Sequence, residues 1–448
     1  MPLSVSATGR APRPSIAIPG LKRILSTLRL AGSRGLAMVA QVLVQMAVGA
    51  LSGPVGLGIL QLFSTWSNFL GEILARGWPS MVLKRVSVAW GQDDRPSARA
   101  TASSASRAIL NGWPLGLVAA VVFVITGQFF SISTTALEGA LLVLALLAAA
   151  IVFALLRVRS EALKGADAPL TAVTLENLAL PSVLLAVCLA CVLFQVTLSP
   201  ALLVLGCVLG VVIAAAWLGR AVNAQLGSMV TEAPTVESPA ERRERRALWL
   251  SSAQAIAFLQ LPFLVMPAFT DVGTIGVYAV AHKLINVITT LLILLGSIYG
   301  PAFARAAADA DAGQLRILLR RTQSISLVVF GPAAVILLLT SNGIAGLFNV
   351  PPQGLQDFML ILVLGQLINA ATGLSGILLN MTGAARTEWR ISLLSLCAAL
   401  LLIVPVGGKY GANGLAILFS AVIASKNIAS WLAARHHLVS GVVTNEST

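Results

Sequence analysis

Twelve long apolar segments, each bounded by glycine, proline or charged residues, restrict the fold of this chain more than any other feature. A membrane-spanning helix needs about 20 mostly apolar residues. Only 10% of the 448 residues are charged, whereas soluble domains average about 25%. The sequence therefore predicts an all-α polytopic membrane protein. The expected spans are 33–52, 55–80, 104–127, 139–157, 171–196, 200–220, 248–268, 274–298, 319–340, 356–380, 389–406 and 412–433.

The lysines and arginines test this segmentation, because loops on the cytoplasmic side of a membrane are enriched in them. With these spans, 26 of the 30 basic residues lie before the first span, in alternate loops or at the edges of the spans that border them, and the other loops contain only Lys409. A wrong number of spans would disrupt this alternation. We therefore expect a multi-pass protein of the bacterial inner membrane with both termini in the cytoplasm.

A polar stretch at 221–247 divides the spans into two groups of six, and its charge run Glu241–Arg246 predicts a solvated, headgroup-facing segment. A weak repeat supports this division, because Val55-Gly56-Leu57 and Ile275-Gly276-Val277 open the second span of each group. Transporters commonly place their substrate path between such repeats. The predicted units are a cytoplasmic tail 1–32, an N-lobe 33–220, a cytoplasmic linker 221–247, a C-lobe 248–434 and a cytoplasmic tail 435–448.

Composition argues against several other classes of function. The net charge of +13 is dispersed among apolar segments and is not interleaved with aromatic residues, so we expect no nucleic-acid partner. The four cysteines lie in apolar runs, and no second pair or histidine cluster completes a metal site. The chain has no phosphate-binding loop that ends in Lys-Ser/Thr, so ATP hydrolysis is not expected. We expect a transporter without metal or cofactor rather than an enzyme.

Short glycine-centred motifs follow one another along nearly the whole chain from about residue 26. They are Ser52-Gly53-Pro54-Val55-Gly56-Leu57, Gly77, Lys84-Arg85-Val86, Ile275-Gly276-Val277-Tyr278, Ala281, Lys283, Pro301-Ala302-Phe303, Gly331-Pro332, Leu378-Leu379-Asn380-Met381-Thr382-Gly383 and Tyr410-Gly411-Ala412-Asn413-Gly414. In order and spacing they resemble the polysaccharide flippases of the multidrug/oligosaccharidyl-lipid/polysaccharide (MOP) exporter superfamily, which includes the Wzx-type translocases.

The resemblance implies a V-shaped bundle of two six-helix lobes around a central cavity that works by alternating access. The implied substrate is an undecaprenyl-pyrophosphate-linked oligosaccharide for exopolysaccharide, O-antigen or capsule synthesis. Membrane lipids and a polysaccharide polymerase or export complex are the implied partners. The chain has no room for the two further helices of peptidoglycan-precursor flippases, and residues 35–52 lack the acid that drug exporters often place in the first helix.

The remaining three basic residues, Arg76, Lys283 and Lys426, lie farther inside predicted spans. A charge in the bilayer costs about 2.5–3.5 kcal/mol on insertion scales, so it normally faces a cavity or a partner. Cationic positions on the first, second and eighth helices recur in the resembling family, and Arg34, Arg76 and Lys283 match them loosely. We interpret Arg34 together with the three cations inside the spans as a substrate path for an anionic head group. The alternatives are a Glu72–Arg76 pair at i,i+4, snorkelling of Arg34 and a role of Lys283 in holding its helix against a neighbour. For Lys426 they are pairing with an inner-leaflet group or a wrongly placed helix.

Other polar residues in the spans are candidates for coupling or for the sugar path. Glu72, Glu176 and His282 are candidates for ion coupling or for pairing. The remaining candidates either line the sugar path or join helices. They are Asn286, Gln366, Asn369 and Asn380.

Two alternative functions remain at this stage. Efflux of small cations predicts an acidic cavity, whereas the charges within these spans are mainly basic. A membrane polymerase or ligase needs catalytic groups on sizeable outer loops. The expected outer loops are short and carry few charges, namely Glu138, Asp271, Lys409 and, at an edge, Asp357.

Overall fold

The computed structural model describes residues 21–126, 136–227, 237–309 and 311–439, which form helices joined by short turns and contain no strand. The first half comprises α1 (Leu21–Ala75), α2 (Trp78–Gly91), α3 (Arg95–Leu110), α4 (Trp113–Thr126), α5 (Ala136–Gly165), α6 (Pro169–Leu193) and α7 (Pro200–Leu226). The second half comprises α8 (Pro239–Val265), the short 3-10 helix η2 (Met266–Ala268), α9 (Val272–Ala308), α10 (Ala312–Leu339), α11 (Ser341–Phe348), α12 (Pro352–Thr372), α13 (Ser375–Met381) and α14 (Ala385–Val439).

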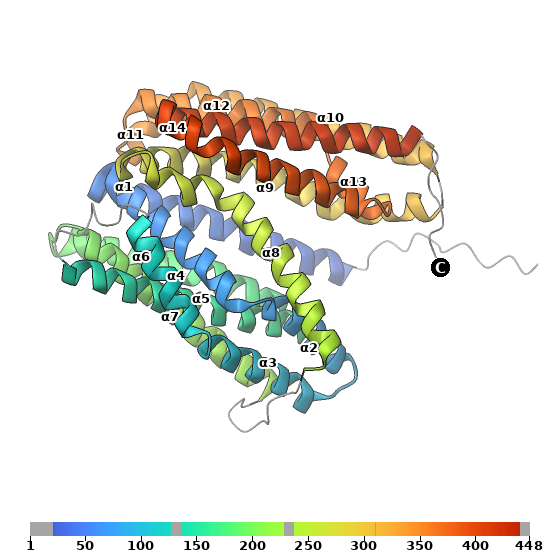
Figure 1. Cartoon of the computed structure of the whole chain (residues 1–448), viewed down its shortest axis with the longest axis horizontal. Coiled ribbons are helices and arrows are strands. Elements are labelled where there is room, and N and C mark those ends of the chain that lie inside the picture. Colours follow the sequence, from blue (N-terminus) through green and yellow to red (C-terminus); the bar gives the residue numbers. More distant parts are fainter. Residues whose placement is uncertain (1–20, 127–135, 228–236, 310, 440–448) are drawn as a thin grey trace, which may run out of the picture.

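The predicted number of spans is confirmed within the described residues. Nine helices are long and apolar enough to cross a membrane, and α3 with α4 forms a tenth span that is bent by 45°. Two of the nine, α1 and α14, each contain two spans, because the backbone leaves the helical conformation at Gly53 (φ 60) and Gly411 (φ 57). Glycine adopts positive φ readily because it has no Cβ. Counting each of these two helices as two spans brings the total within the described residues to twelve. Figure 1 shows that both helices turn back on themselves.

Figure 1 shows the helices in two lobes, α1–α7 below and α9–α14 above, which lie together at one end and separate towards the other. We call the end with Gly53 and Gly411 the kink end, and the end with Leu21 and Val439 the terminal end. Helix α8 runs diagonally from the upper lobe at the kink end to α2 of the lower lobe at the terminal end (Figure 1). The predicted all-α architecture of two six-helix lobes is therefore confirmed.

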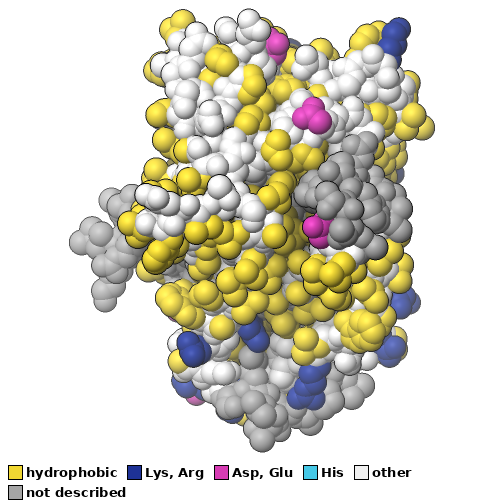
Figure 2. Space-filling model, turned by 90° about the vertical axis from the view of Figure 1, so that its left-hand side faces the viewer, with side chains coloured by type: hydrophobic (Ala, Val, Ile, Leu, Met, Phe, Trp, Pro, Cys, Tyr) yellow, Lys and Arg dark blue, Asp and Glu magenta, His cyan; other side chains and the backbone are white. Residues whose placement is uncertain are grey.

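The lobes carry large apolar side chains on their outer surfaces, as expected of a protein in lipid. Leu339 is 80% exposed and Leu401 is 78% exposed. Figure 2, which faces the kink end, shows hydrophobic side chains across the middle of this face and most of the visible Lys and Arg along its lower edge. Apolar side chains therefore predominate on this face, and most of the visible basic side chains lie towards one edge of it.

Several predicted helix boundaries are wrong, and local capping explains two of them. Helix α8 begins at Pro239 rather than at 248, because Ser238 and Glu241 form a capping box in which each side chain accepts a hydrogen bond from the other's backbone N–H. The charge run Glu241–Arg246 is therefore helical. Similarly, the Asp311 carboxylate accepts a hydrogen bond from Gln314 N, so α10 begins at Ala312 rather than at 319.

Other differences reflect interruptions of the predicted spans. The span 55–80 ends at Ala75, because Arg76 (φ 46) and Gly77 (φ 78) have left-handed backbone conformations. The span 356–380 is divided at Gly373 (φ 63) into α12 and α13. At the other extreme, α1 already begins at Leu21, within the segment expected to be a tail.

At the kink end, α1 and α9 pack backbone against backbone. A Cβ on Gly276 would clash with the carbonyl oxygen of Pro54, and a Cβ on Gly58 would clash with that of Val272. A Cβ on Gly49 would likewise clash with the carbonyl oxygen of Phe348. Gly276 of the weak repeat therefore lies where the lobes meet and permits this close approach, and on α1 the matching residue is Gly58, because Gly56 of the repeat contacts only α1 itself.

At the terminal end, the lower lobe contacts α8 through charged side chains. Lys84 and Arg85 of α2 pair with Glu244 (2.5 Å) and Glu241 (2.7 Å) of α8. The Arg245 guanidinium lies 4.8 Å from the centre of the Trp78 ring and donates a hydrogen bond to the Arg76 carbonyl oxygen at 2.8 Å. The first turns of α8 are thereby attached to the N-lobe.

Candidate functional site

A central cavity of about 390 Å³ lies between the two halves of α1, α5 and α6, with α8 and α9 of the other half of the chain at its edge. This volume falls within the usual range of about 300–1,000 Å³ for ligand sites. Such sites are mostly apolar, whereas most residues that line this one are polar. The polar lining residues are Gln41, Gln45, Gln61, Ser64, Thr65, Asn68, Arg157, Glu176, Asn177, Gln260 and Lys283.

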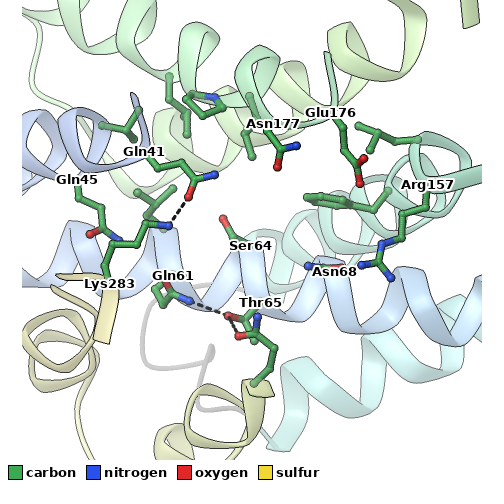
Figure 3. A pocket seen from close by; sticks show the side chains of 18 residues that line it. Gln41, Gln45, Gln61, Ser64, Thr65, Asn68, Arg157, Glu176, Asn177 and Lys283 are labelled. Atoms are coloured by element: carbon green, nitrogen blue, oxygen red, sulfur yellow. Dashed lines mark hydrogen bonds between the residues drawn. The ribbon is translucent and has the colours of Figure 1, made fainter. Parts of the chain in front are cut away.

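Carboxamides are the commonest side chains of this lining. Gln41 and Gln45 are one turn apart on the first half of α1, and Gln61 and Asn68 share a face of its second half. Ser64 lies between these two and, like Asn177 of α6, points towards the middle of the cavity (Figure 3). The buried Gln45 Oε1 accepts no hydrogen bond from the described residues. Because each amide both donates and accepts hydrogen bonds, this lining suits a ligand rich in hydroxyl groups.

Lys283 is the cation that the C-lobe contributes to the cavity. It projects from α9, and its Nζ donates a hydrogen bond to Gln41 Oε1 of α1 (Figure 3). No ion pair among the described residues involves Lys283. A lysine held by a neutral amide keeps donors for an anionic ligand. The prediction that Lys283 faces a cavity therefore agrees with its position.

A second polar contact crosses between the lobes at the cavity floor. Thr65 Oγ1 of α1 lies 3.3 Å from Gln260 Oε1 of α8 and also accepts a hydrogen bond from Gln61 at 3.0 Å. Close by, the Trp66 indole donates to the carbonyl oxygen of Phe263 at 3.1 Å. Because these contacts join α1 to α8, movement of the lobes must change the cavity lining.

The other charged groups at the cavity form ion pairs. Arg157 of α5 binds Glu72 at 2.5 Å, and the other oxygen of Glu72 accepts a hydrogen bond from Ser252 of α8 at 2.5 Å. Glu176 accepts hydrogen bonds from Ser160 (2.5 Å) and from Lys164 (3.2 Å). Both carboxylates therefore already have cationic partners, although Lys164 is shared with Glu161 at 2.8 Å, and Lys283 is the charged lining residue that has no carboxylate partner among the described residues.

Arg76 does not lie in the cavity, and the prediction that it belongs to the substrate path is wrong for this conformation. It lies at the break between α1 and α2, where its guanidinium donates to the carbonyl oxygen of Ala108 at 3.0 Å. The alternative of an i,i+4 pair with Glu72 is also wrong, because Arg157 takes that position. The helix ends one residue before Arg76, which turns the side chain towards the N-lobe interior.

Lys426 and Arg34 also lie outside the cavity lining. Lys426 binds Glu388 at 2.6 Å, and Ser430 donates to the other oxygen of Glu388 at 2.6 Å. Lys426 thus joins the two halves of α14 through Glu388, a partner that the sequence analysis did not name. Arg34 is exposed near the terminal end of α1.

His282 and the four amide residues predicted for the sugar path do not line the cavity. The His282 ring lies 5.1 Å from the centre of the Phe263 ring and 3.1 Å from the Asn286 amide. The amide of Asn369 donates to Gln366 Oε1 at 2.9 Å. Asn380 is exposed on α13. In this conformation these amide contacts of Asn286, Gln366 and Asn369 lie within their own helices, and none of these side chains lines the cavity.

The amide lining is absent from the sequence predictions, although the spacing of polar residues in the first two spans indicates it. Gln41 and Gln45 occur at i,i+4, and Gln61, Thr65 and Asn68 occur at i,i+4,i+7, within otherwise apolar runs. Such spacing places polar side chains on one face of a helix. The predictions for the first two spans concerned their charged residues alone and therefore did not include these amides.

Comparison with known proteins is informative at the level of the fold. The sequence matches no protein-family model and no curated protein at a significant level. The structure is similar to a multidrug resistance MATE family transporter of the MOP superfamily in an inward-facing conformation, with 12% identity and a TM-score of 0.71 over 92% of this chain and 96% of the other. The chain thus has the fold of MATE family transporters of the MOP superfamily.

Two further solved structures show the range of conformations and pockets in this fold. An outward-facing MATE transporter matches with 15% identity and a TM-score of 0.58 over 93% of this chain and 96% of the other. A MOP superfamily transporter from Pyrococcus furiosus, described as having a binding pocket of reversed polarity, matches with 16% identity and a TM-score of 0.58 over 92% of this chain and 95% of the other. The TM-score is therefore higher for the inward-facing structure than for the outward-facing one.

Proposed function

We propose that the protein moves an undecaprenyl-pyrophosphate-linked oligosaccharide from the inner to the outer leaflet of the bacterial inner membrane by alternating access. The observation that carries this proposal is the central cavity, in which Lys283 is surrounded by carboxamides. The amides offer paired donors and acceptors to sugar hydroxyls. The lysine offers charge-assisted hydrogen bonds to phosphate oxygens.

The contacts of Lys283 give a route from binding to movement. The lysine belongs to α9, and its present partner, Gln41, belongs to α1. A phosphate oxygen that takes the place of Gln41 removes one of the contacts that join the lobes in this state. A ligand shifts a conformational equilibrium when it interacts differently with the two states. Substrate binding at Lys283 therefore favours rearrangement of the lobes.

Membrane potential supplies a driving force for an anionic head group. The basic residues at the terminal end favour a cytoplasmic position for that end, so export carries the head group towards the positive side of the membrane. A potential of 100 mV contributes about 2.3 kcal/mol per charge. A doubly charged diphosphate thus gains about 4–5 kcal/mol on crossing.

Efflux of a cationic small molecule is the second candidate function. It is favoured by the multidrug transporters among the structural neighbours and by the presence of Glu176 in the cavity lining. The pairing of Glu176 with Lys164 and of Glu72 with Arg157 argues against it, because a cationic substrate must compete for these carboxylates.

Deletion of the gene, followed by mass spectrometry of the lipid-linked sugars, distinguishes the two functions. We expect a complete, unpolymerised repeat unit to accumulate on its lipid carrier. Wild-type protein and Lys409→Gln restore the normal pool, and Lys283→Gln at equal protein level does not. Lys409 is a matched control, because it lies near the kink of α14, where its ammonium is 5.2 Å from the centre of the Tyr410 ring. An unchanged lipid pool with new drug sensitivity contradicts flipping and supports efflux.

A further inference from the structure

A second cleft lies between α10 and α14 at the terminal end of the C-lobe, outside the central cavity. Its volume is about 620 Å³. On α10 it is lined by Arg316, Leu319, Arg320 and Gln323, which follow i,i+3,i+4,i+7 spacing. Trp431, Arg435, Leu438 and Val439 line it from α14 with i,i+4,i+7,i+8 spacing. One face of each helix therefore turns towards the other across this cleft.

The cleft has three arginines and no acidic residue in its lining. No ion pair between described residues involves Arg316, Arg320 or Arg435. Arg316 donates to the Leu438 carbonyl oxygen at 2.9 Å, and the Arg435 guanidinium lies 4.7 Å from the centre of the Trp431 ring. These contacts hold the two guanidiniums at the cleft, and neither provides a carboxylate partner from the described part of the chain.

The depth of the cleft matches that of lipid head groups. Trp431 lies about 20 residues beyond the kink at Gly411, which corresponds to about 30 Å of helix. That length equals the hydrocarbon thickness of a typical bilayer. Arg320 lies about as far from the end of α10 at Leu339. Tryptophan and arginine at this depth are typical of the membrane–water interface.

Apolar surface that faces lipid surrounds the basic cleft. Val439 is 74% exposed, and next to the lining residues Ile317 is 60% and Leu432 54% exposed. Leu319 and Leu438 are buried at the base of the cleft. A ligand with a phosphate and a hydrocarbon tail can therefore place its phosphate among the arginines while its tail remains on the adjoining apolar surface.

We propose that the cleft between α10 and α14 binds the phosphate of a lipid head group. Guanidinium groups donate paired hydrogen bonds to phosphate oxygens, and basic pockets between membrane helices on the cytoplasmic side bind anionic lipid head groups. The phosphate belongs either to an anionic phospholipid of the bilayer or to a polyprenyl diphosphate. The site shares no residue with the central cavity and does not depend on the proposed transport.

Lipid retention by the purified full chain in detergent, measured by native mass spectrometry, tests this site. The probes are phosphatidylglycerol, phosphatidylcholine, a polyprenyl diphosphate and inorganic pyrophosphate. We expect phosphatidylglycerol to be retained over phosphatidylcholine, and pyrophosphate, which has no tail, to bind weakly. The variant Arg320→Gln/Arg435→Gln should lose at least about tenfold in retention. Arg321→Gln provides a matched control, since Arg321 is exposed on α10 outside the cleft and should retain lipid like the wild type.

Competition identifies the source of the phosphate. Displacement of phosphatidylglycerol by an equal amount of polyprenyl diphosphate indicates a site for the lipid-linked substrate, and retention of phosphatidylglycerol indicates a bilayer phospholipid. Equal retention by the double variant and the wild type overturns the proposal, as does equal loss in Arg321→Gln. If the double variant is unstable, Arg320→Lys/Arg435→Lys keeps the charge but lacks the planar donor pair, and it should show intermediate retention.

Discussion

The two ends of the interface between the lobes are built in different ways. At the kink end, glycines of α1 and α9 allow direct contact between backbones, and Gly276 lies against the Pro54 carbonyl group. At the terminal end, the N-lobe holds α8 through ion pairs such as Lys84–Glu244, whose side chains are 58% and 43% exposed. One contact depends on close steric fit and the other on charged side chains, of which Lys84 and Glu244 are solvent-accessible and Arg85 and Arg245 are largely buried.

This difference suits a protein that must open one end while the other is closed. A packed contact is either formed or lost, because a small gap between the two surfaces already removes much of the dispersion attraction between their atoms. Exposed ion pairs contribute only about 0–1 kcal/mol each, since water solvates the separated charges well. The kink end should therefore act as an all-or-none seal, whereas the terminal-end contacts exchange at small cost.

The largest effect is expected for Gly276→Ala at the kink end. The added Cβ clashes with the Pro54 carbonyl oxygen, and overpacking of this kind costs about 1–3 kcal/mol. The lobes should separate at this end, which double electron–electron resonance between spin labels on the two lobes measures as a longer distance. Gly331→Ala is the control, because a Cβ at that helical glycine meets no atom within 4 Å. Identical distance distributions in both variants would contradict the claim that close packing at Gly276 holds the kink end closed.

An intermediate effect is expected for Ser252→Ala, which removes a half-buried contact between α8 and Glu72. A hydrogen bond to a charged group contributes about 1.5–3 kcal/mol. The Arg157–Glu72 pair remains, so we expect a loss of about 1 kcal/mol in the attachment of α8. Hydrogen exchange of α8 should increase near Ser252 while that of α5 stays unchanged. Ser251→Ala on the exposed side of the same turn should have no effect, and an equal response of the two variants would contradict this role.

The smallest effect is expected for the exposed pair Lys84–Glu244. Charge reversal in Lys84→Glu should weaken the terminal-end contact by less than about 1 kcal/mol. The swapped variant Lys84→Glu/Glu244→Lys should restore it, and 1 M salt should reduce the difference because it screens charges beyond about 3 Å. Distances between labels on α2 and α8 provide the measurement. A shift as large as that of Gly276→Ala would show that the terminal end is not the weaker contact.

The sequence predicted the twelve spans because the requirements of the bilayer are strong and local. Apolar length and the alternation of lysine and arginine determine the span count without knowledge of any tertiary contact. Gly53 and Gly411 were correctly placed at turns between spans. The boundaries at Ser238 and Asp311 were wrong because a single capping side chain extends a helix into polar sequence.

The site was less predictable, because the partner of a charged residue depends on tertiary structure. Arg76, Lys283 and Lys426 look alike in sequence, yet one contacts a carbonyl group, one lies in the cavity and one binds Glu388. The Glu388 partner is close to Lys426 only because α14 folds back at Gly411. Polar spacing on the two halves of α1 was the more reliable guide to the cavity.

Transbilayer movement in vesicles tests the central claim most directly. The purified full chain is reconstituted with a lipid-linked oligosaccharide, a membrane potential is imposed, and the fraction of the sugar that an external glycosidase can reach is followed with time. We predict movement by the wild type and Lys409→Gln, and a rate at least about tenfold lower for Lys283→Gln, because the charge-assisted hydrogen bond to the phosphate is lost. Equal rates for Lys283→Gln and the wild type, or no movement by the wild type, would contradict the account.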